Sequence, residues 1–187
     1  MDTLTTVSDV CARLELLVDR AGGASIIFVG VSGVPGSGKT TLVAQLVNTL
    51  RAAHGDGWVA ALPMDGFHLP RSTLDEMSDP ARAHARRGSP FTFSPDGFAS
   101  CIEALRKHGS GSAPGFDHVV GDPEPGAIVI PAGVRLVIVE GNYLLLGRLE
   151  DGHTEADGTP LAAAWREVDS ALVRWARENR EFAAAQY

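Results

Sequence analysis

One run of the sequence, from Ser25 to Leu50, constrains the fold more than any other. It begins with an apolar, β-branched segment that predicts a buried strand and that breaks at Gly33. After a glycine-rich loop, apolar residues recur at helical spacing, namely Leu42, Val43, Leu46, Val47 and Leu50. The run therefore predicts a strand, a glycine loop and a helix in direct succession.

The loop matches the pattern G-x-x-x-x-G-K-[ST] in full. Its glycines allow backbone N–H groups to approach an anion, and a helix that opens near Gly38 adds its positive dipole end. Lys39 is placed to reach the β- and γ-phosphates of a nucleotide, and the Thr40 hydroxyl to ligate Mg²⁺. An ordinary glycine-rich turn is the weaker alternative, given the Lys-Thr pair. The expected phosphate-binding residues are Gly33, Val34, Pro35, Gly36, Ser37, Gly38, Lys39, Thr40 and Thr41.

Length and composition limit the alternatives. The 187 residues suit a single domain, and 16 basic against 23 acidic residues give a net charge of −7, which argues against a general binder of nucleic acid or of acidic membranes. Cys11 and Cys101 lie far apart and predict neither a disulfide framework nor a zinc site. No signal peptide or membrane span is readable, so a soluble cytoplasmic protein is expected.

A second buried strand is predicted over residues 58–63, as a parallel neighbour of the first. Ligands of open α/β sheets bind beyond the carboxyl ends of the strands, so Asp65 and His68 are expected beside the phosphate loop. A carboxylate there can accept the proton of a reacting hydroxyl or orient it for attack on a γ-phosphate. The alternative for Asp65 is an Asp-Gly turn without chemistry.

Three further helices are predicted, over residues 6–21 with Thr6 or Ser8 as N-cap, from Asp79-Pro80 through Arg87, and over 95–108. Arg82, Arg86 and Arg87 cluster, and one of them can pair with an anionic group of a substrate, although a solvated basic helix face is equally compatible. The segment 113–125 is turn-rich and carries an aromatic and ionisable residues, as ligand-binding loops often do.

Residues 127–130 and 134–139 are predicted strands, the second ending at Glu140. An acidic residue at the end of a buried strand beside a phosphate loop commonly acts on Mg²⁺ or its water shell. A lone acid at a strand end is the competing interpretation.

Five motifs in order resemble a known family: GVPGSGKTT at 33–41, MDGFHL at 64–69, RRGSPFTF at 86–93, FDH with DP within 116–123, and IVEGNYLLL at 138–146. Together they look like the P-loop small-molecule kinases grouped with uridine kinase, pantothenate kinase and phosphoribulokinase, in the branch called nucleoside/nucleotide kinase-like. The likeness covers roughly residues 10–147.

The resemblance implies an α/β P-loop NTPase fold of three layers with a mainly parallel central sheet, and ATP and Mg²⁺ as cosubstrates. It implies Lys39 and Thr40 at the phosphates and metal, Asp65 as catalytic base, and Glu140 near the metal. The expected acceptor pocket is lined by His68, Arg87, Phe116 and His118.

The sequence departs from the family at Ser94, where an Asp is usual, and after residue 147, where a polar loop over 147–159 and a divergent Ala-rich helical stretch replace the expected lid and last strands. Arg174, Arg177 and Arg180 could replace the lid, although their spacing favours a solvated helix face. The C-terminus therefore appears shortened in the sequence pattern. A shortened sheet would expose an edge that a second copy of the chain could cover, as a homodimer.

The expected function is that of an ATP-dependent phosphotransferase acting on a hydroxyl of a small metabolite, such as a nucleoside, a pantothenate-like compound or a sugar. The alternative is a C-terminally shortened nucleotide-binding protein without kinase turnover, either regulatory or inactive. A P-loop GTPase is disfavoured because no N-K-x-D-type motif is present.

Overall fold

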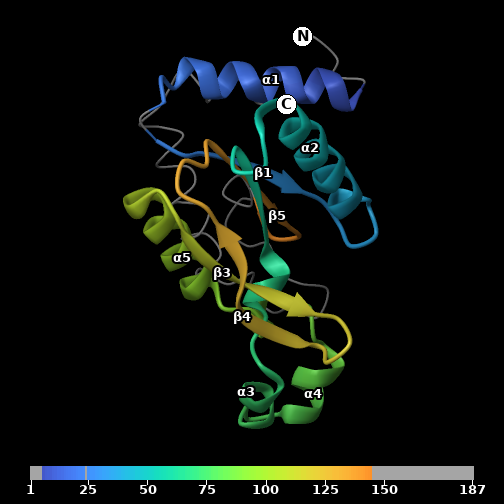
Figure 1. The fold of residues 1–187 in the computed structure, drawn as a ribbon. Coiled ribbons are helices and arrows are strands. Elements are labelled where there is room, and N and C mark those ends of the chain that lie inside the picture. The colour runs from blue at the N-terminus through green and yellow to red at the C-terminus, as the bar shows by residue number, and fades with distance from the viewer. Residues whose placement is uncertain (1–5, 24, 145–187) are drawn as a thin grey trace, which may run out of the picture.

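The structure is a computed structural model that describes residues 6–23 and 25–144. The predicted loop over 147–159, the helical stretch after it, and Arg174, Arg177 and Arg180 lie outside these residues. Figure 1 shows α1 and α2 on one side of a central sheet and α5 with a β-hairpin on the other. The elements, in order, are α1 Val7–Arg20, β1 Ile27–Ser32, α2 Lys39–His54, β2 Val59–Pro63, η1 Met64–Phe67, α3 Arg71–Asp75, α4 Pro80–Ala85, η2 Pro90–Thr92, α5 Pro95–His108, β3 Gly111–Asp117, β4 Asp122–Ile130 and β5 Leu136–Gly141.

Two apolar clusters hold the layers together. Side chains alternate across a strand, so neighbouring residues of β1, β2 and β5 face opposite helices. One cluster joins the sheet to α1 and α2, and includes Leu14, Val47, Ile27 and Leu136. The other joins the sheet to α5 and the hairpin, and includes Phe98, Ile102, Phe28 and Val137. The three-layer α/β fold with a parallel sheet is thus confirmed for the described residues.

The strand order corrects one expectation. The described parallel sheet runs β1-β5-β2, so β2 is not the neighbour of β1. A helical crossover requires the two strands to be parallel but does not require them to be adjacent. The central position is taken by β5, which is buried along its whole length, because a strand between two others has both faces and both edges covered.

The predicted helices α1, α4 and α5 begin where the sequence places them, whereas α3 was not predicted. Thr6 caps α1 in a capping box with Asp9, Asp79 caps α4, and α5 spans the predicted residues 95–108. Ser94 is the N-cap of α5, its hydroxyl accepting a hydrogen bond from the N–H of Gly97. The departure from the family's Asp at this position therefore keeps a capping residue, since Ser and Asp cap helices about equally well.

The prediction of a turn-rich loop over residues 113–125 is wrong. It lies within the antiparallel hairpin of β3 and β4, which has an irregularity in register between Ala113 and Gly115. Prolines and glycines normally argue against strands, but they are tolerated in edge strands and at bulges. Among the described residues, each strand of this hairpin has one unpaired edge.

Cys11 and Cys101 are free thiols, as expected. Among the described residues, no helix is long and apolar enough to cross a membrane.

Candidate active site

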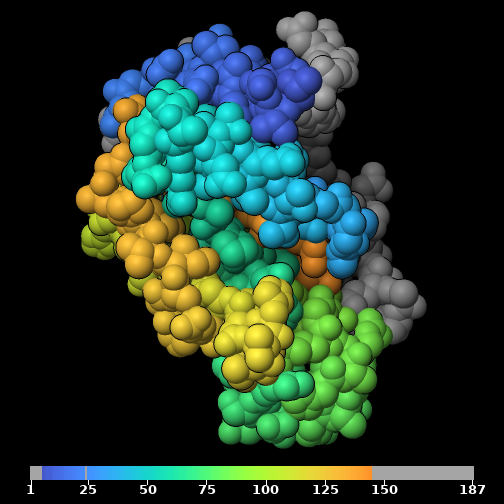
Figure 2. Space-filling model, turned by 45° about the vertical axis from the view of Figure 1, so that its right-hand side comes forward, coloured from blue at the N-terminus to red at the C-terminus, as the bar shows by residue number. Residues whose placement is uncertain are grey.

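Three strand ends bring the predicted catalytic groups to one edge of the sheet. Glu140 of β5 lies opposite Val31 of β1 and Pro63 of β2 in the parallel registers. The phosphate loop follows β1, and Asp65 comes directly after β2. In Figure 2 the surface is hollowed between the light-blue start of α2 and the yellow hairpin, with the teal residues that follow β2 at its floor. This hollow is the candidate active site.

The phosphate loop has the backbone that its glycines predict. Gly36 and Gly38 have φ of 77° and 85°, a region that other residues rarely adopt. No side chain caps the start of α2, so the N-terminal N–H groups of the helix remain available to an anion. The Lys39 ammonium donates to the carbonyl of Val34 at 3.0 Å, which folds this side chain over the loop. The loop residues thus fit a nucleotide's phosphates.

Thr40 and Glu140, the two predicted metal residues, are in direct contact. The Thr40 hydroxyl donates to Oε1 of Glu140 at 2.5 Å, and Glu140 is only 9% exposed. Hydroxyl and carboxylate oxygens are ligands that suit Mg²⁺, which normally takes only one or two from protein and the rest from water and phosphates. Within the described part of the chain, no cluster of three His, Cys, Asp or Glu side chains could hold a metal ion. The pair therefore fits a metal that arrives with a nucleotide.

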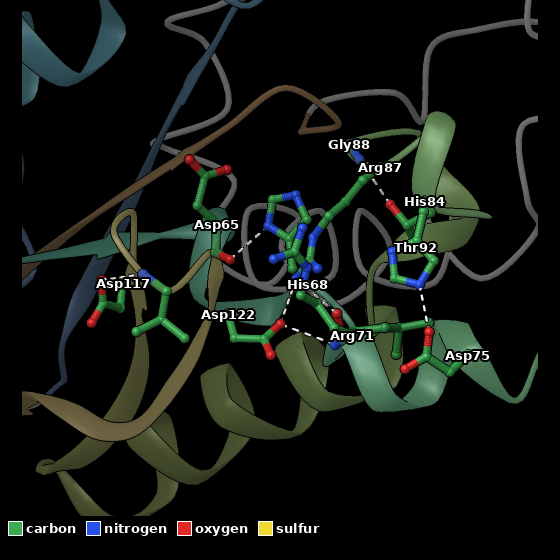
Figure 3. Close-up of polar contacts among 12 residues, drawn as sticks. Asp65, His68, Arg71, Asp75, His84, Arg87, Gly88, Thr92, Asp117 and Asp122 are labelled. Atoms are coloured by element: carbon green, nitrogen blue, oxygen red, sulfur yellow. Dashed lines mark hydrogen bonds and ion pairs between the residues drawn. The ribbon is translucent and has the colours of Figure 1, made fainter. Parts of the chain in front are cut away.

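Asp65 lies in η1, a short 3₁₀-helix whose position depends on its next residue. A Cβ on Gly66 would lie 2.0 Å from the carbonyl oxygen of Pro114, so only glycine allows η1 to pack on the hairpin. This close approach explains the Asp-Gly pair better than a simple turn does. In Figure 3 the Asp65 carboxylate points away from His68, whose ring meets the Asp65 main chain.

The four residues predicted to line the acceptor pocket gather in one cluster. The rings of His68 and Phe116 are 4.9 Å apart, and those of Phe116 and His118 are 5.1 Å apart. Cζ of Arg87 lies 5.8 Å from the centre of the Phe116 ring. We call these four residues the acceptor cluster; its members come from three separate motifs.

Backbone hydrogen bonds hold two of these motifs, residues 64–69 and 86–93, side by side. The N–H of Leu69 donates to Thr92 at 2.8 Å, and the N–H of Ser94 donates to Phe67 at the same distance. Tyr143 donates its hydroxyl to the carbonyl of Gly88 at 2.8 Å, which anchors the same loop to the segment after β5. The loop that carries Arg87 is thereby fixed on two sides.

Phe93 and Asp122 are two further members of the site that the sequence did not predict. Phe93 lies against His68 with ring centres 3.9 Å apart. Asp122 accepts a hydrogen bond from Nη2 of Arg87 at 2.8 Å and another from the N–H of Arg71 at 3.0 Å. Its Asp-Pro pair belongs to the resemblance, but no sequence feature placed it beside an arginine 35 residues away. Arg82, by contrast, lies over Phe91 at 5.9 Å.

The environment of His68 fixes its protonation. Nδ1 lies 2.8 Å from the carbonyl of Asp65, and because a carbonyl can only accept, this nitrogen carries the proton. Burial lowers the pKa of His68, with Arg87 and His118 acting in the same direction, while the main-chain bond and the Asp65 charge oppose the change. His68 is therefore held neutral at physiological pH, with Nε2 as an acceptor.

Asp122 is held in the opposite state. The hydrogen bond from Arg87 lowers the pKa of this carboxyl and outweighs the opposing effect of burial, and the Arg71 N–H lowers the pKa further. The Asp122–Arg87 pair is thus ionised, and it joins the start of β4 to the loop after α4.

Comparison with known proteins places this geometry in context. No protein-family model matches the chain. A Schizosaccharomyces pombe protein named "Putative uridine kinase C227.14" is 40% identical over 124 residues, 65% of this chain and 53% of that protein. The "ATP-dependent kinase-like protein notR'" of Aspergillus versicolor is 46% identical over 90 residues, 46% of this chain and 52% of that protein. The chain spans about half the length of the curated relatives it matches.

Solved structures agree on the fold. A protein of Silicibacter sp. TM1040 described as a "putative fructose transport system kinase" matches with a TM-score of 0.69 at 28% identity, over 97% of this chain and 86% of that one. YFH7 of Saccharomyces cerevisiae matches with a TM-score of 0.70 at 20% identity, over 91% of this chain and 79% of that one. The chain is thus similar in sequence to proteins named as kinases, and its fold is that of the P-loop kinases.

Proposed function

We propose that the protein transfers the γ-phosphate of ATP to a hydroxyl of a small metabolite. The observation that carries the proposal is the shared sheet edge, where the phosphate loop, the Thr40–Glu140 pair and Asp65 follow three adjacent strands. The acceptor cluster lies next to Asp65, since His68 bonds to the Asp65 main chain. Donor and acceptor groups thus lie on either side of one carboxylate.

The chemistry follows from these positions. The phosphate-loop N–H groups and Lys39 hold the β- and γ-phosphates and stabilise the charge that develops during transfer. Asp65 accepts the proton of the acceptor hydroxyl as its oxygen forms the new bond to the γ-phosphorus. The bond from that phosphorus to the β-phosphate oxygen breaks, and ADP leaves. Asp65 also aligns the hydroxyl for this in-line displacement.

Thr40 and Glu140 are the residues proposed to hold Mg²⁺, Thr40 through its hydroxyl and Glu140 through its carboxylate or a water. The ion would neutralise phosphate charge when bound. Without the ion, the hydrogen bond between the two side chains holds the Thr40 hydroxyl and the Glu140 carboxylate next to each other.

A screen of hydroxyl-bearing metabolites for ADP release from Mg-ATP tests the proposal. Lys39→Ala should lower the acceptor-dependent rate by about 10²- to 10³-fold, as loss of one transition-state donor does. Lys107→Ala is the matched control, because this lysine is exposed on α5, away from the sheet edge. Binding of Mg-ATP with no acceptor-dependent ADP release from any metabolite would instead favour a nucleotide-binding protein without turnover.

A further inference from the structure

We infer that the acceptor carries a negatively charged group and that Arg87 binds it. The inference rests on the proposed function, because it names the class of molecule that the acceptor cluster receives. The Arg87 guanidinium has donors that lack a hydrogen-bond partner in the described part of the chain. Nη2 of Arg87 donates to Asp122 and to the carbonyl of Leu69, whereas Nε and Nη1 are buried and have no partner among the described residues.

Unpaired donors on a buried guanidinium are costly. A buried donor without an acceptor loses its hydration and gains nothing in return, and the loss is larger on a charged group. The Arg87 side chain is only 15% exposed, and its two unpartnered nitrogens are themselves buried from bulk solvent. A ligand that brings anionic oxygens would supply them, and guanidinium groups favour carboxylate and phosphate oxygens above others.

Local charge supports an anion over a neutral acceptor. Two arginines contact Asp122, Arg87 through its side chain and Arg71 through its main chain. The Arg71 guanidinium also lies beside Gly121 at the end of the hairpin, 3.7 Å from the position of a Cβ there. The Asp122 carboxylate therefore faces two cations, and His68 is neutral. Asp117 also carries a negative charge, but its carboxylate accepts hydrogen bonds from the N–H groups of Val119 and Val120 in the hairpin turn.

The rest of the cluster defines the shape of the acceptor. Figure 3 shows His68 between Asp65 and Arg87, so a hydroxyl at Asp65 and an anionic group at Arg87 would sit at opposite ends of one small molecule. The Phe116 ring lies over the guanidinium, and the hairpin turn beyond it is exposed, Val119 by 96% and Val120 by 61%.

Equilibrium binding with matched pairs tests the inference. The probes are glycerate against glyceramide, and ribose 5-phosphate against ribose, which separate a carboxylate from a phosphate preference. Binding is measured by calorimetry in the presence of ADP and Mg²⁺. We expect at least one anion to bind about tenfold to a hundredfold more tightly than its neutral partner, the range that charged hydrogen bonds provide. Because no phosphoryl transfer is measured, this result stands or falls separately from the kinase assay.

Variants that remove a positive or a negative charge from the Arg87–Asp122 pair make the test specific. Arg87→Gln should abolish the preference for the anion, and Arg87→Lys should keep part of it. Asp122→Asn should strengthen anion binding several-fold, because it removes the carboxylate that competes for Arg87. Arg13→Gln, at an exposed position on α1, is the control. Affinity for ADP should be unchanged in all four variants, which shows that they fold.

Two results would overturn the inference. One is equal binding of the charged and neutral members of both pairs. The other is an equal loss of anion binding in Arg87→Gln and Asp122→Asn, because a purely structural ion pair fails in the same way whichever partner is removed.

Discussion

The two halves of the candidate site are built differently. The phosphate half is one continuous stretch, residues 33–41, and its proposed contacts are chiefly main-chain groups and a helix end. The acceptor half is assembled from side chains of η1, the loop after α4, and the hairpin. A main-chain site depends on local sequence, and a side-chain site depends on how distant segments pack. The same fold can therefore keep the first and vary the second, which is how P-loop folds serve different acceptors.

The largest effect is expected where the two halves meet. Asp65→Asn should lower the acceptor-dependent turnover by about 10²- to 10⁴-fold, because the amide cannot take the proton of the hydroxyl. ATP binding should change little, since the phosphate half is separate. Steady-state kinetics beside nucleotide titration checks both. Unchanged turnover of an identified acceptor would show that Asp65 is not the base.

Gly66→Ala should damage the acceptor half and spare the other. The new Cβ would meet the Pro114 carbonyl at 2.0 Å, and overpacking against backbone typically costs about 1 to 3 kcal/mol of unfolding free energy. Chemical denaturation measures this loss. Gly57→Ala is the matched control, since its Cβ would approach nothing closer than Pro131 at 3.9 Å. Equal stability of the two variants would mean that η1 does not depend on the hairpin.

Glu140→Gln should affect the phosphate half through the metal alone. The amide keeps the size of the side chain and an acceptor for Thr40, but removes the charge near the ion. The Mg²⁺ concentration for half-maximal activity should rise about 10- to 100-fold, the usual effect of altering groups that orient metal ligands. A magnesium titration at saturating ATP gives the value. If Glu140→Gln changed only the KM for the acceptor, Glu140 would belong to the acceptor half instead.

The smallest effect is expected from the charge state of His68. Burial lowers its pKa in the folded chain, whereas the unfolded chain protonates it near the ordinary value of 6.5. Its contribution to stability is thus present above that pH and is lost as the pH falls below it. Denaturation between pH 7.5 and 5 should show a shallower decline in His68→Gln than in the native chain. His108→Gln, exposed at the end of α5, should keep the native slope.

The sequence predicts the phosphate half of the site better than the acceptor half, for the same reason. Gly33 to Thr40 could be located because consecutive residues carry the whole pattern, and Glu140 because it ends an apolar run. His68 was expected near the phosphate loop because it follows β2, and Arg87 was one of three candidate arginines. Their grouping with Phe116 and His118 in one acceptor pocket came from the resemblance alone. Asp122 was missed because an ion pair across 35 residues leaves no periodicity.

The errors in the fold have a similar cause. The sequence shows that β1 and β2 are parallel but contains nothing local that inserts β5 between them. Residues 113–125 of the hairpin were taken for a loop because their prolines and glycines outweigh the few β-formers, whereas residues 127–130 were predicted as a strand.

The central place of β5 has a consequence for synthesis on the ribosome. β1 and β2 have no direct pairing in the described sheet, and both wait for a strand that begins at residue 136. Until that segment leaves the exit tunnel, the nascent chain holds two apolar strands with open edges, which are prone to associate with other chains. The last described strand thus joins β1 to β2 and aligns the phosphate loop with Asp65 in one step, so nucleotide binding should appear abruptly once residues 136–141 have left the tunnel.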